Sequence, residues 1–217
     1  MTTAVGVMAR APSSVGKTRL APHLSSDRLR ALRAALFTDT LRAVESLPDV
    51  FIFFTPDEAE QEIASLAGGV GPRVPQCDGD LGARMLGALR YLLEDRTFDA
   101  AVLVGSDIPL LTANHLREAA ETLQAYGGLV LGPADDGGYY LIGMTRPHAA
   151  LFDGIAWGSE SVLTDTLRTA ERTGMEARLV RSAYDVDTVD DLLRLERDLG
   201  WAPADVCPAV RRWFSER

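Results

Sequence analysis

The first loop of this chain carries the residue types that bind phosphate. The run Ala11–Thr18, Ala-Pro-Ser-Ser-Val-Gly-Lys-Thr, comes directly after an apolar run at residues 3–9. Gly16 permits backbone amides to approach an anion. Lys17 supplies a point charge and Arg19 a planar fork for phosphate oxygens. The loop therefore predicts a phosphate-binding site, with a solvated loop of no function as the alternative.

The same loop nearly matches the P-loop pattern G-x-x-x-x-G-K-[ST], with Ala11 in place of the first glycine. A P-loop lysine opens a helix directly. Here Pro22 follows Lys17 closely and would cost a hydrogen bond inside such a helix. The helical periodicity starts near Asp27 instead. We therefore predict a long basic loop rather than the P-loop of a kinase or ATPase.

Asp107 stands just past the most apolar run of the chain, Ala100–Val104. A carboxylate at the carboxyl end of a strand is a natural first ligand for Mg²⁺, which takes one or two protein carboxylates and completes its shell with water and substrate phosphates. The ion would bridge phosphate oxygens and offset charge on a leaving group. A turn aspartate before Pro109 is the plainer interpretation.

A second carboxylate for this ion is available in the run Tyr184-Asp185-Val186-Asp187-Thr188. Alternation along an extended segment places Asp185 and Asp187 on the same side, just before a helical pattern. We take Asp187 as the second ligand and Asp185 as its alternative. Ordinary hydrogen bonding before a capped helix would also account for both.

The segment from Gly132 to Tyr140 joins two strand-like runs and contains Asp136-Gly137-Gly138. Asp-Gly favours a primed hairpin turn. The functional interpretation is that Gly137 and Gly138 let backbone approach a ligand. Asp136 would then accept hydrogen bonds from hydroxyl groups, or act as a general base, and Tyr139 would supply an aromatic wall.

Two further segments offer ligand contacts. Trp157 precedes a helical pattern and is either a core residue or a flat platform for a sugar or base. The run Asp78-Gly79-Asp80-Leu81-Gly82 also precedes a helix. Asp80 and Gly82 could line a nucleotide pocket with Arg84, or form a plain N-cap and first turn.

Runs typical of buried strands alternate with helical patterns along the chain. Strands are expected at residues 3–9, 50–55, 73–77, 100–104, 129–131, 139–144 and 177–180, and helices at 27–46, 57–66, 81–92, 112–126, 159–173 and 189–199. Thr188 and Asp191 fit a capping box before the last helix. This order predicts an α/β fold with a mainly parallel sheet covered on both faces, whose ligands bind at the carboxyl ends of the strands.

Composition narrows the function classes. The chain has 217 residues, a formal net charge of −9 and 47% hydrophobic residues, which excludes general disorder and disfavours duplex nucleic acid as a partner. We expect one domain at residues 1–199 and a tail at 200–217, with homo-oligomerisation left open. No run approaches the ~20 apolar residues of a membrane span.

The compartment is inferred from the cysteines and the N-terminal residues. Cys77 and Cys207 are expected to be reduced, as in a cytoplasmic protein. The first residues show no signal-peptide pattern. The three histidines, His23, His115 and His148, have no zinc-ligand spacing.

Six segments in order resemble a family of GT-A-like proteins described as glycosyltransferases or nucleotide-diphospho-sugar transferases, some in arsenosugar-type gene contexts. They are SVGKTRLAP, CDGDLGARM, VLVGSDIPLLT, LGPADDGGYYLIG, FDGIAWGSESVLTDT and DVDTVDDL, within residues 4–199. More distantly, the region from Gly16 to Val44 resembles 2-phospholactate guanylyltransferases. The closing segment DVDTVDDL resembles molybdopterin cytidylyl- and guanylyltransferases.

The resemblance implies a Rossmann-like GT-A fold with a mixed, mainly parallel sheet between helices. It also implies a nucleotide over the N-terminal half and a divalent metal. The candidate site combines these implications with the residues above. Phosphate and nucleotide contacts are assigned to Arg10, Gly16, Lys17, Arg19, Asp80 and Gly82. Substrate contacts are assigned to Gly137, Gly138, Tyr139 and Trp157. Catalysis is assigned to Asp107 and Asp136, and the binding of Mg²⁺ or Mn²⁺ to Asp107 and Asp187.

The leading functional hypothesis is a metal-dependent transferase with a small-molecule nucleotide donor, specifically a glycosyltransferase using a nucleotide-diphospho-sugar. The alternative is nucleotidyl transfer from a nucleoside triphosphate to a phosphorylated small molecule with release of pyrophosphate. A nucleotide-binding regulator and a P-loop kinase are weaker alternatives. Two departures bear on the choice: Gly105-Ser106-Asp107 stands where GT-A glycosyltransferases have Asp-x-Asp, and the first loop is poorer in glycine than that of nucleotidyltransferases.

Overall fold

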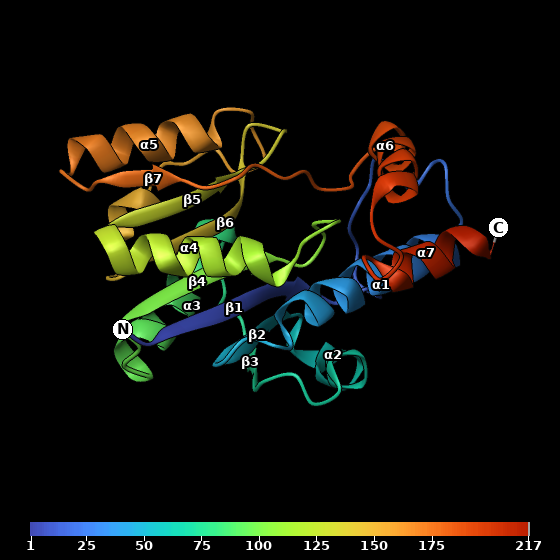
Figure 1. The fold of residues 1–217 in the computed structure, drawn as a ribbon, viewed down its shortest axis with the longest axis horizontal. Helices are drawn as coiled ribbons and strands as arrows, with labels where there is room; N and C mark the ends of the chain where they lie inside the picture. The colour runs from blue at the N-terminus through green and yellow to red at the C-terminus, as the bar shows by residue number, and fades with distance from the viewer. Residues whose placement is uncertain (217) are drawn as a thin grey trace.

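A seven-stranded sheet runs through the computed structural model, which describes residues 1–216 (Figure 1). Its strands are β1 (Thr3–Arg10), β2 (Val50–Thr55), β3 (Arg73–Pro75), β4 (Ala100–Gly105), β5 (Leu129–Pro133), β6 (Tyr139–Met144) and β7 (Ala177–Leu179). They lie in the order β3-β2-β1-β4-β6-β5-β7, and β6 is antiparallel to β4 and β5 while the other pairs are parallel. The expected α/β fold with a mixed, mainly parallel sheet is confirmed.

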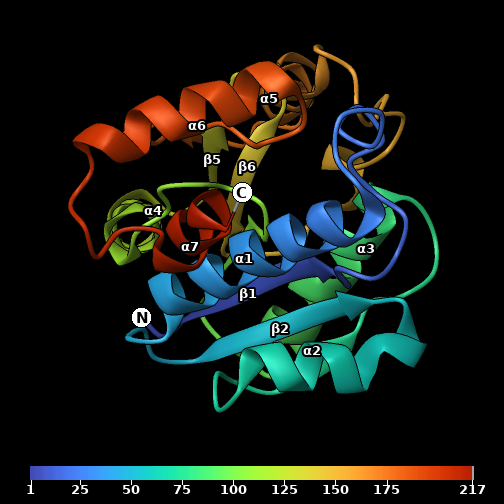
Figure 2. The same ribbon diagram turned by 90° about the vertical axis from the view of Figure 1, so that its right-hand side faces the viewer.

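Seven α-helices surround the sheet in the described part of the chain. They are α1 (Ser26–Val44), α2 (Glu60–Ala67), α3 (Leu81–Arg90), α4 (Ala113–Tyr126), α5 (Val162–Arg172), α6 (Val189–Trp201) and α7 (Pro208–Ser215). Short 3₁₀ turns at Asp57–Ala59 and Ala149–Leu151 and a π turn at Tyr91–Asp95 complete the set. Figure 2 shows α1 and α4 on one side of the strands and α3 on the other.

Alternation along the strands divides the core between the two faces of the sheet. Val102 and Val104 of β4 pack with residues of α1, α2 and α4, whereas Ala101 and Leu103 pack with residues of α3 and α5. Because successive strand side chains point to opposite faces, a continuous apolar run is required when both faces are covered. The run Ala100–Val104 therefore has the pattern of a central strand, and all five residues are buried.

One boundary differs from the expectation in a way that matters for the site. The helix predicted from Ser159 begins only at Val162. Residues 155–159 form tight turns instead, in which Trp157 donates its backbone N–H to Ile155 and Ser159 donates to Ala156. Gly158 has φ +84°, which a helix does not allow. Trp157 therefore lies in a turn beside the sheet rather than at a helix start.

The C-terminal residues pack onto the body through α7, a helix that the sequence pattern did not predict (Figure 2). Asp39 of α1 accepts hydrogen bonds from the first-turn amides of α7, Ala209 at 3.0 Å and Val210 at 2.9 Å. Trp213 donates its indole N–H to the Arg28 carbonyl at 3.0 Å, and the Arg28 guanidinium lies 4.1 Å above its ring. These contacts join α7 to α1.

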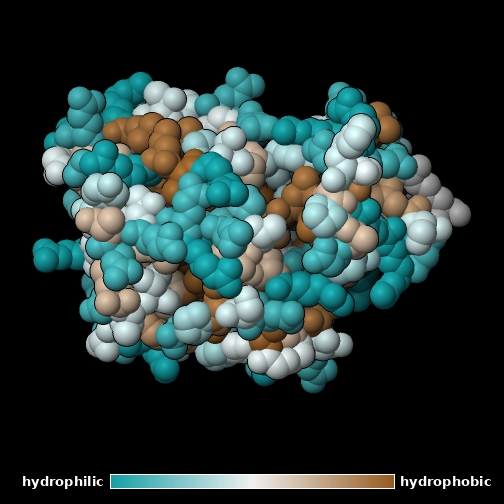
Figure 3. All heavy atoms as spheres, in the orientation of Figure 1, coloured by the Kyte–Doolittle hydropathy of each residue, from teal (hydrophilic) through white to brown (hydrophobic). Residues whose placement is uncertain are grey.

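The surface in the orientation of Figure 3 is mostly hydrophilic, with scattered apolar patches. Within residues 1–216, none of the helices has the length and apolar character that a membrane span needs. Cys77 and Cys207 are both free thiols, as expected.

The packing of α7 generates a stability prediction that uses two tryptophans as a matched pair. Trp213 is 5% exposed, whereas Trp201 at the end of α6 is 92% exposed. Trp213→Ala removes a buried aromatic ring and should lower the free energy of unfolding by about 3–5 kcal/mol. Trp201→Ala should change it by less than about 0.5 kcal/mol. Urea unfolding measures both, and similar losses for the two variants would contradict this packing.

Candidate functional site

A cavity of about 430 Å³ opens at the carboxyl ends of β1 and β4, between these strands and the segments that follow β5 and β7. Most of its polar lining residues come from loops or strand ends, and Arg33 comes from α1. Of the residues predicted for the site, the lining includes Arg10, Gly16, Lys17, Asp107, Asp136, Gly138, Tyr139, Trp157 and Asp187. It does not include Arg19, Asp80, Gly82 or Gly137. The sheet therefore brings most of the predicted residues together at its ligand-binding edge.

The ammonium group of Lys17 ties three segments of the chain together. It donates to Asp107 Oδ2 at 2.9 Å, to Asp187 Oδ1 at 3.1 Å and to the Val186 carbonyl at 2.6 Å. An ammonium group has three N–H donors, so all three are used. The predicted residue lies in the cavity, but its charge faces the two carboxylates rather than a free phosphate site.

Burial and charge set the ionisation of this cluster. The Lys17 side chain is only 6% exposed. Burial by itself lowers the pKa of Lys17, but the attraction of Asp107 and Asp187 outweighs it, and the pKa is raised. Burial likewise favours the neutral form of Asp107, yet the Lys17 charge and hydrogen bond hold the pKa of that carboxyl below its ordinary value. The cluster is therefore a charged ion-pair network at neutral pH.

Asp185 faces the same network without a cation of its own. Burial raises its pKa to about 6, and repulsion from Asp187, Asp107 and Asp136 adds to the shift. Four carboxylates therefore converge on a region in which Lys17 is the directly paired cation. The cavity lining as a whole holds these four carboxylates against three cations, Arg10, Lys17 and Arg33.

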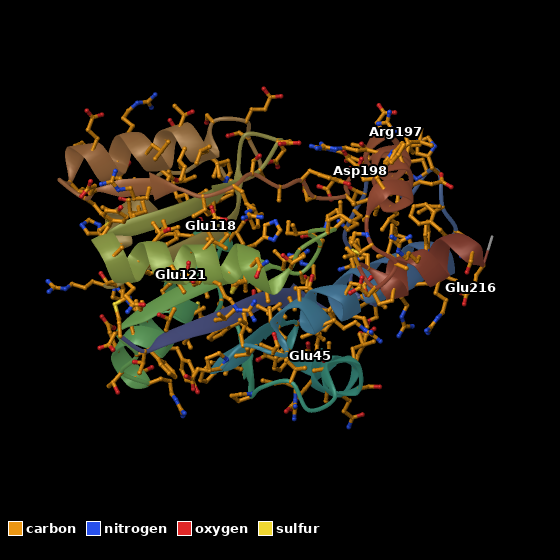
Figure 4. The ribbon with its side chains drawn as sticks, in the orientation of Figure 1. Glu45, Glu118, Glu121, Arg197, Asp198 and Glu216 are labelled. Carbon is orange, nitrogen blue, oxygen red and sulfur yellow. The ribbon has the colours of Figure 1, made fainter. Side chains whose placement is uncertain are left out.

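In the extended segment before α6, Asp185 and Asp187 lie on the same side, as the alternation of side chains along a strand predicts. Tyr184 and Val186 are 6% and 0% exposed, whereas Asp185 and Asp187 line the cavity on the other side. The Tyr184 hydroxyl donates at 2.8 Å to Asp198, which is labelled on α6 in Figure 4. The predicted capping box of Thr188 and Asp191 is confirmed and fixes the start of α6.

The first loop has no helix after its lysine, which agrees with the prediction against a P-loop. Residues 17–24 form turns, and α1 starts at Ser26. Lys17 itself has φ +50°, the left-handed region that a residue with a side chain seldom adopts. Such a conformation persists only where surrounding contacts hold it. Here the three hydrogen bonds of Lys17 provide that constraint.

Arg10 and Arg19 were both predicted to bind phosphate, but only Arg10 lines the cavity. Arg19 is exposed and lies outside the cavity, because the turn at Leu20 directs it to solvent. Arg10 lines the cavity and commits only one donor, Nη1, to the Val15 carbonyl at 3.2 Å. Its other N–H donors are therefore left for an anion.

Arg33 of α1 is a cavity residue that the sequence interpretation missed. It is 9% exposed, and its guanidinium donates to the Pro12 carbonyl at 2.8 Å and to the Ser14 carbonyl. A side chain on Gly16 would come within 3.1 Å of this guanidinium, so Gly16 makes room for it. A signal existed: Arg33 lies four residues after Leu29 and three before Leu36, on the buried stripe of the helix.

The segment 132–140 is a hairpin, so the plainer interpretation describes its structure. Gly137 has φ +88°, and a side chain there would meet the backbone of Glu160 at 2.2 Å. The close approach to protein backbone is reason enough for this glycine, and its substrate contact stays a prediction. Asp136 accepts from the Gly138 amide at 2.9 Å and remains exposed at the cavity.

Trp157 and Tyr139 form an aromatic wall of the cavity. Their rings lie edge to face with centroids 6.3 Å apart, and Trp157 stacks near Phe152. Burial raises the pKa of Tyr139. A side chain on Gly82 would come within 2.6 Å of the Trp157 ring, so Gly82 makes space for this indole instead of lining the pocket.

Asp80 is likewise structural. It is the N-cap of α3, and its carboxylate accepts from the Ala83 amide at 2.8 Å. The plain capping role is therefore present, and the nucleotide contact of Asp80 stays a prediction.

The donor set at the strand ends is compatible with Mg²⁺ or Mn²⁺. Within residues 1–216, no group of three or more His, Cys, Asp or Glu side chains is arranged as a metal site. Mg²⁺, however, takes as few as one or two protein carboxylates. Asp107 and Asp187 already share one cationic group, and both side chains are about 40% exposed. The residues fit a hydrated ion that is also held by substrate.

The Lys17 network generates a prediction that separates the two cations of the first loop. Lys17→Met leaves two carboxylates without their shared donor and should lower the free energy of unfolding by about 1.5–3 kcal/mol. Arg19→Met should lower it by less than about 0.5 kcal/mol, because Arg19 is exposed. Both are measured by denaturant unfolding without divalent metal. Equal effects would show that Lys17 does not hold the cluster together.

Three relatives are similar over most of the chain. A phosphoenolpyruvate guanylyltransferase of Roseiflexus sp. (strain RS-1) is 29% identical over 205 residues, covering 93% of this chain and 87% of the relative. A 2-phospho-L-lactate guanylyltransferase of Methanothrix thermoacetophila is 28% identical over 192 residues, covering 84% of this chain and 79% of the relative. A candidate nucleotide-diphospho-sugar transferase from Desulfovibrio desulfuricans G20, known from its crystal structure, is 30% identical in sequence. The two structures superpose with a TM-score of 0.87, which covers 98% of this chain and 95% of the other.

The crystal structure shares the whole fold with this protein, so the expected fold of nucleotide-diphospho-sugar transferases is confirmed. A family model also matches residues 38–159, a stretch that contains Asp107, Asp136 and Trp157. This protein therefore belongs to the family described as uncharacterized protein conserved in bacteria (DUF2064).

Proposed function

We propose that this protein is a divalent-metal-dependent nucleotidyltransferase, which transfers a nucleotidyl group from a nucleoside triphosphate to a small phosphorylated acceptor. The observation that carries the proposal is the Lys17 network with Asp107 and Asp187, placed beside Arg10 in a cavity at the strand ends. Two relatives similar over most of their length are named as guanylyltransferases, which supports this reaction class.

The reaction requires little proton chemistry from the protein. An oxygen of the acceptor phosphate forms a bond to the α-phosphorus of the triphosphate. The bond between that phosphorus and the bridging oxygen to the β-phosphate breaks, and pyrophosphate leaves with the electron pair. An acceptor phosphate is already ionised at neutral pH, so no general base is needed. The cavity lining is consistent with this, because it holds no histidine among the described residues.

The side chains of the protein would bind and orient the reacting phosphates. Arg10 has donors free for phosphate oxygens, and the planar guanidinium suits this contact. Arg33 holds the first loop in place through the Pro12 and Ser14 carbonyls. Asp107 and Asp187 would hold the metal ion, which offsets the negative charge of the triphosphate and of the leaving group.

Glycosyl transfer from a nucleotide-diphospho-sugar is the second candidate. It is supported by the 30% identical structure described as a candidate nucleotide-diphospho-sugar transferase and by the six-segment resemblance. The two reactions differ in the leaving group. Nucleotidyl transfer releases pyrophosphate, whereas glycosyl transfer releases a nucleoside diphosphate.

The experiment follows the leaving group directly. The protein is incubated with Mg²⁺, each of the four nucleoside triphosphates and a panel of phosphorylated acceptors, and pyrophosphate is measured. Parallel reactions contain nucleotide-diphospho-sugars, and nucleoside diphosphate is measured. We expect pyrophosphate release that EDTA abolishes. Release of nucleoside diphosphate alone would establish the second candidate in place of the first.

A matched pair of aspartates tests the site within this assay. Asp107→Asn should lower the rate about 10²–10³-fold, as does loss of one preorganised charge at other active sites. Asp190→Asn should leave it unchanged, because Asp190 lies exposed on the first turn of α6 and does not line the cavity. Wild-type rates for both variants would refute the assignment of the reaction to this cavity.

A further inference from the structure

The two halves of the cavity differ in charge. Its cations, Arg10, Lys17 and Arg33, all belong to β1, the first loop and α1. The opposite half is formed by α3, β6 and the turn before α5, and none of the lining residues described there is Lys, Arg or His. The side chains of this half that carry the argument are Met85, Tyr139, Trp157 and Ser159, with Asp136 at its edge.

Four backbone amides in this half are already paired. In the hairpin loop, the Gly137 amide donates to the Ala134 carbonyl at 3.1 Å and the Gly138 amide donates to the Asp136 carboxylate at 2.9 Å. In the turn before α5, the amides of Trp157 and Ser159 donate to carbonyls of the same turn at 3.0 and 3.1 Å. Amides that are already paired do not form an anion-binding nest.

Two nearby arginines lie outside the lining and have partners in the protein. Arg194 pairs with Asp135 at 2.6 Å, beside the same hairpin. Arg84 donates its Nε to the Gly79 carbonyl at 3.0 Å. A carboxylate or a second phosphate placed against the aromatic wall would therefore lose its water without a cation in the lining to pair with, and Asp136 lines the same cavity. Burial of an unpaired charge costs several kcal/mol.

From this we propose that the acceptor is a phosphomonoester whose remaining part is uncharged and hydroxyl-bearing, as in a phosphorylated sugar. The inference rests on the proposed nucleotidyl transfer and names the substrate class for it. The acceptor phosphate lies at the cationic half, where its oxygen attacks the α-phosphorus and pyrophosphate departs. The uncharged part lies against Trp157 and Tyr139, with Asp136 and Ser159 available to hydroxyl groups.

The two guanylyltransferase relatives are named after acceptors of a different class. Phosphoenolpyruvate and 2-phospho-L-lactate each carry a carboxylate beside the phosphate. The cation-free half of the cavity selects against that second charge. Aromatic rings with a few polar groups are instead the usual lining for an uncharged ring that must be oriented.

The first test compares acceptors at fixed triphosphate and Mg²⁺. The probes are α-D-glucose 1-phosphate, α-D-mannose 1-phosphate and N-acetyl-α-D-glucosamine 1-phosphate against phosphoenolpyruvate and 2-phospho-L-lactate, with pyrophosphate as the readout. We expect turnover with at least one sugar phosphate and at least about tenfold lower kcat/KM with both carboxylates. A preference for a carboxylate, or no turnover with any of the sugar phosphates, overturns the inference. Turnover with a carboxylate alone leaves the nucleotidyl transfer itself standing.

Variants then locate the uncharged part of the acceptor. Trp157→Ala should raise the KM for the sugar phosphate about tenfold and leave the KM for the triphosphate unchanged, while Trp157→Phe restores most of the affinity. Thermal melting confirms that both variants are folded. A raised KM for the triphosphate instead would place the nucleotide base against Trp157 and overturn the inference.

A charge-insertion variant supplies the converse test. Ser159→Lys places a cation in the cation-free half and should raise kcat/KM for phosphoenolpyruvate or 2-phospho-L-lactate at least tenfold over the wild type. Thr164→Lys is the matched control, because Thr164 is exposed on α5 and lies outside the cavity. It should leave kcat/KM for both carboxylate acceptors unchanged. Equal effects from the two lysines would mean that the charge of the cavity half does not select the acceptor.

Discussion

The shared ammonium group of Lys17 is the contact on which the site depends. It joins the loop after β1, the loop after β4 and the segment before α6, which lie 90 and 170 residues apart in sequence. Without it, Asp107 and Asp187 would repel each other across the strand ends. One buried cation therefore converts three separate loops into a single rigid wall. Because all three donors of Lys17 are used, the phosphate contacts that we propose would come from Arg10 and from a metal ion.

The same network explains why carboxylates can gather in one cavity. Asp185 remains without a paired cation, and its pKa of about 6 reflects burial first and the neighbouring charges second. Under the proposed function, a triphosphate would meet these carboxylates, and a divalent ion bound with it would offset their charge. The cations of the protein and the aromatic wall lie in different halves of the cavity. A phosphate-rich substrate and an uncharged group can consequently be bound side by side.

The sequence allowed the sheet, most helices and most cavity residues to be predicted, since apolar periodicity and strand-end position are local properties. The orientation of loop side chains was not predictable in the same way. Lys17 and Arg19 differ by two positions, yet one is buried against Asp187 and the other is exposed, because the partner is contributed from far along the chain. Gly82 and Gly137 were taken for ligand contacts, whereas each makes room for a distant part of the protein, the Trp157 ring and the Glu160 backbone. Helix α7 was missed because its packing on α1 depends on Asp39, which lies 170 residues before Ala209.

The separation of the Lys17 partners also determines when the site can exist during synthesis. Ribosomes deliver β1, β2 and β4 early, and these strands can pair before the chain is complete. Val186 and Asp187 emerge much later, and they provide two of the three acceptors of the Lys17 ammonium group. Only a chain synthesised past Asp187 contains all three acceptors of the Lys17 ammonium group. A chain that ended after β7 would have all seven strands but would lack Asp185 and Asp187 of the cavity lining.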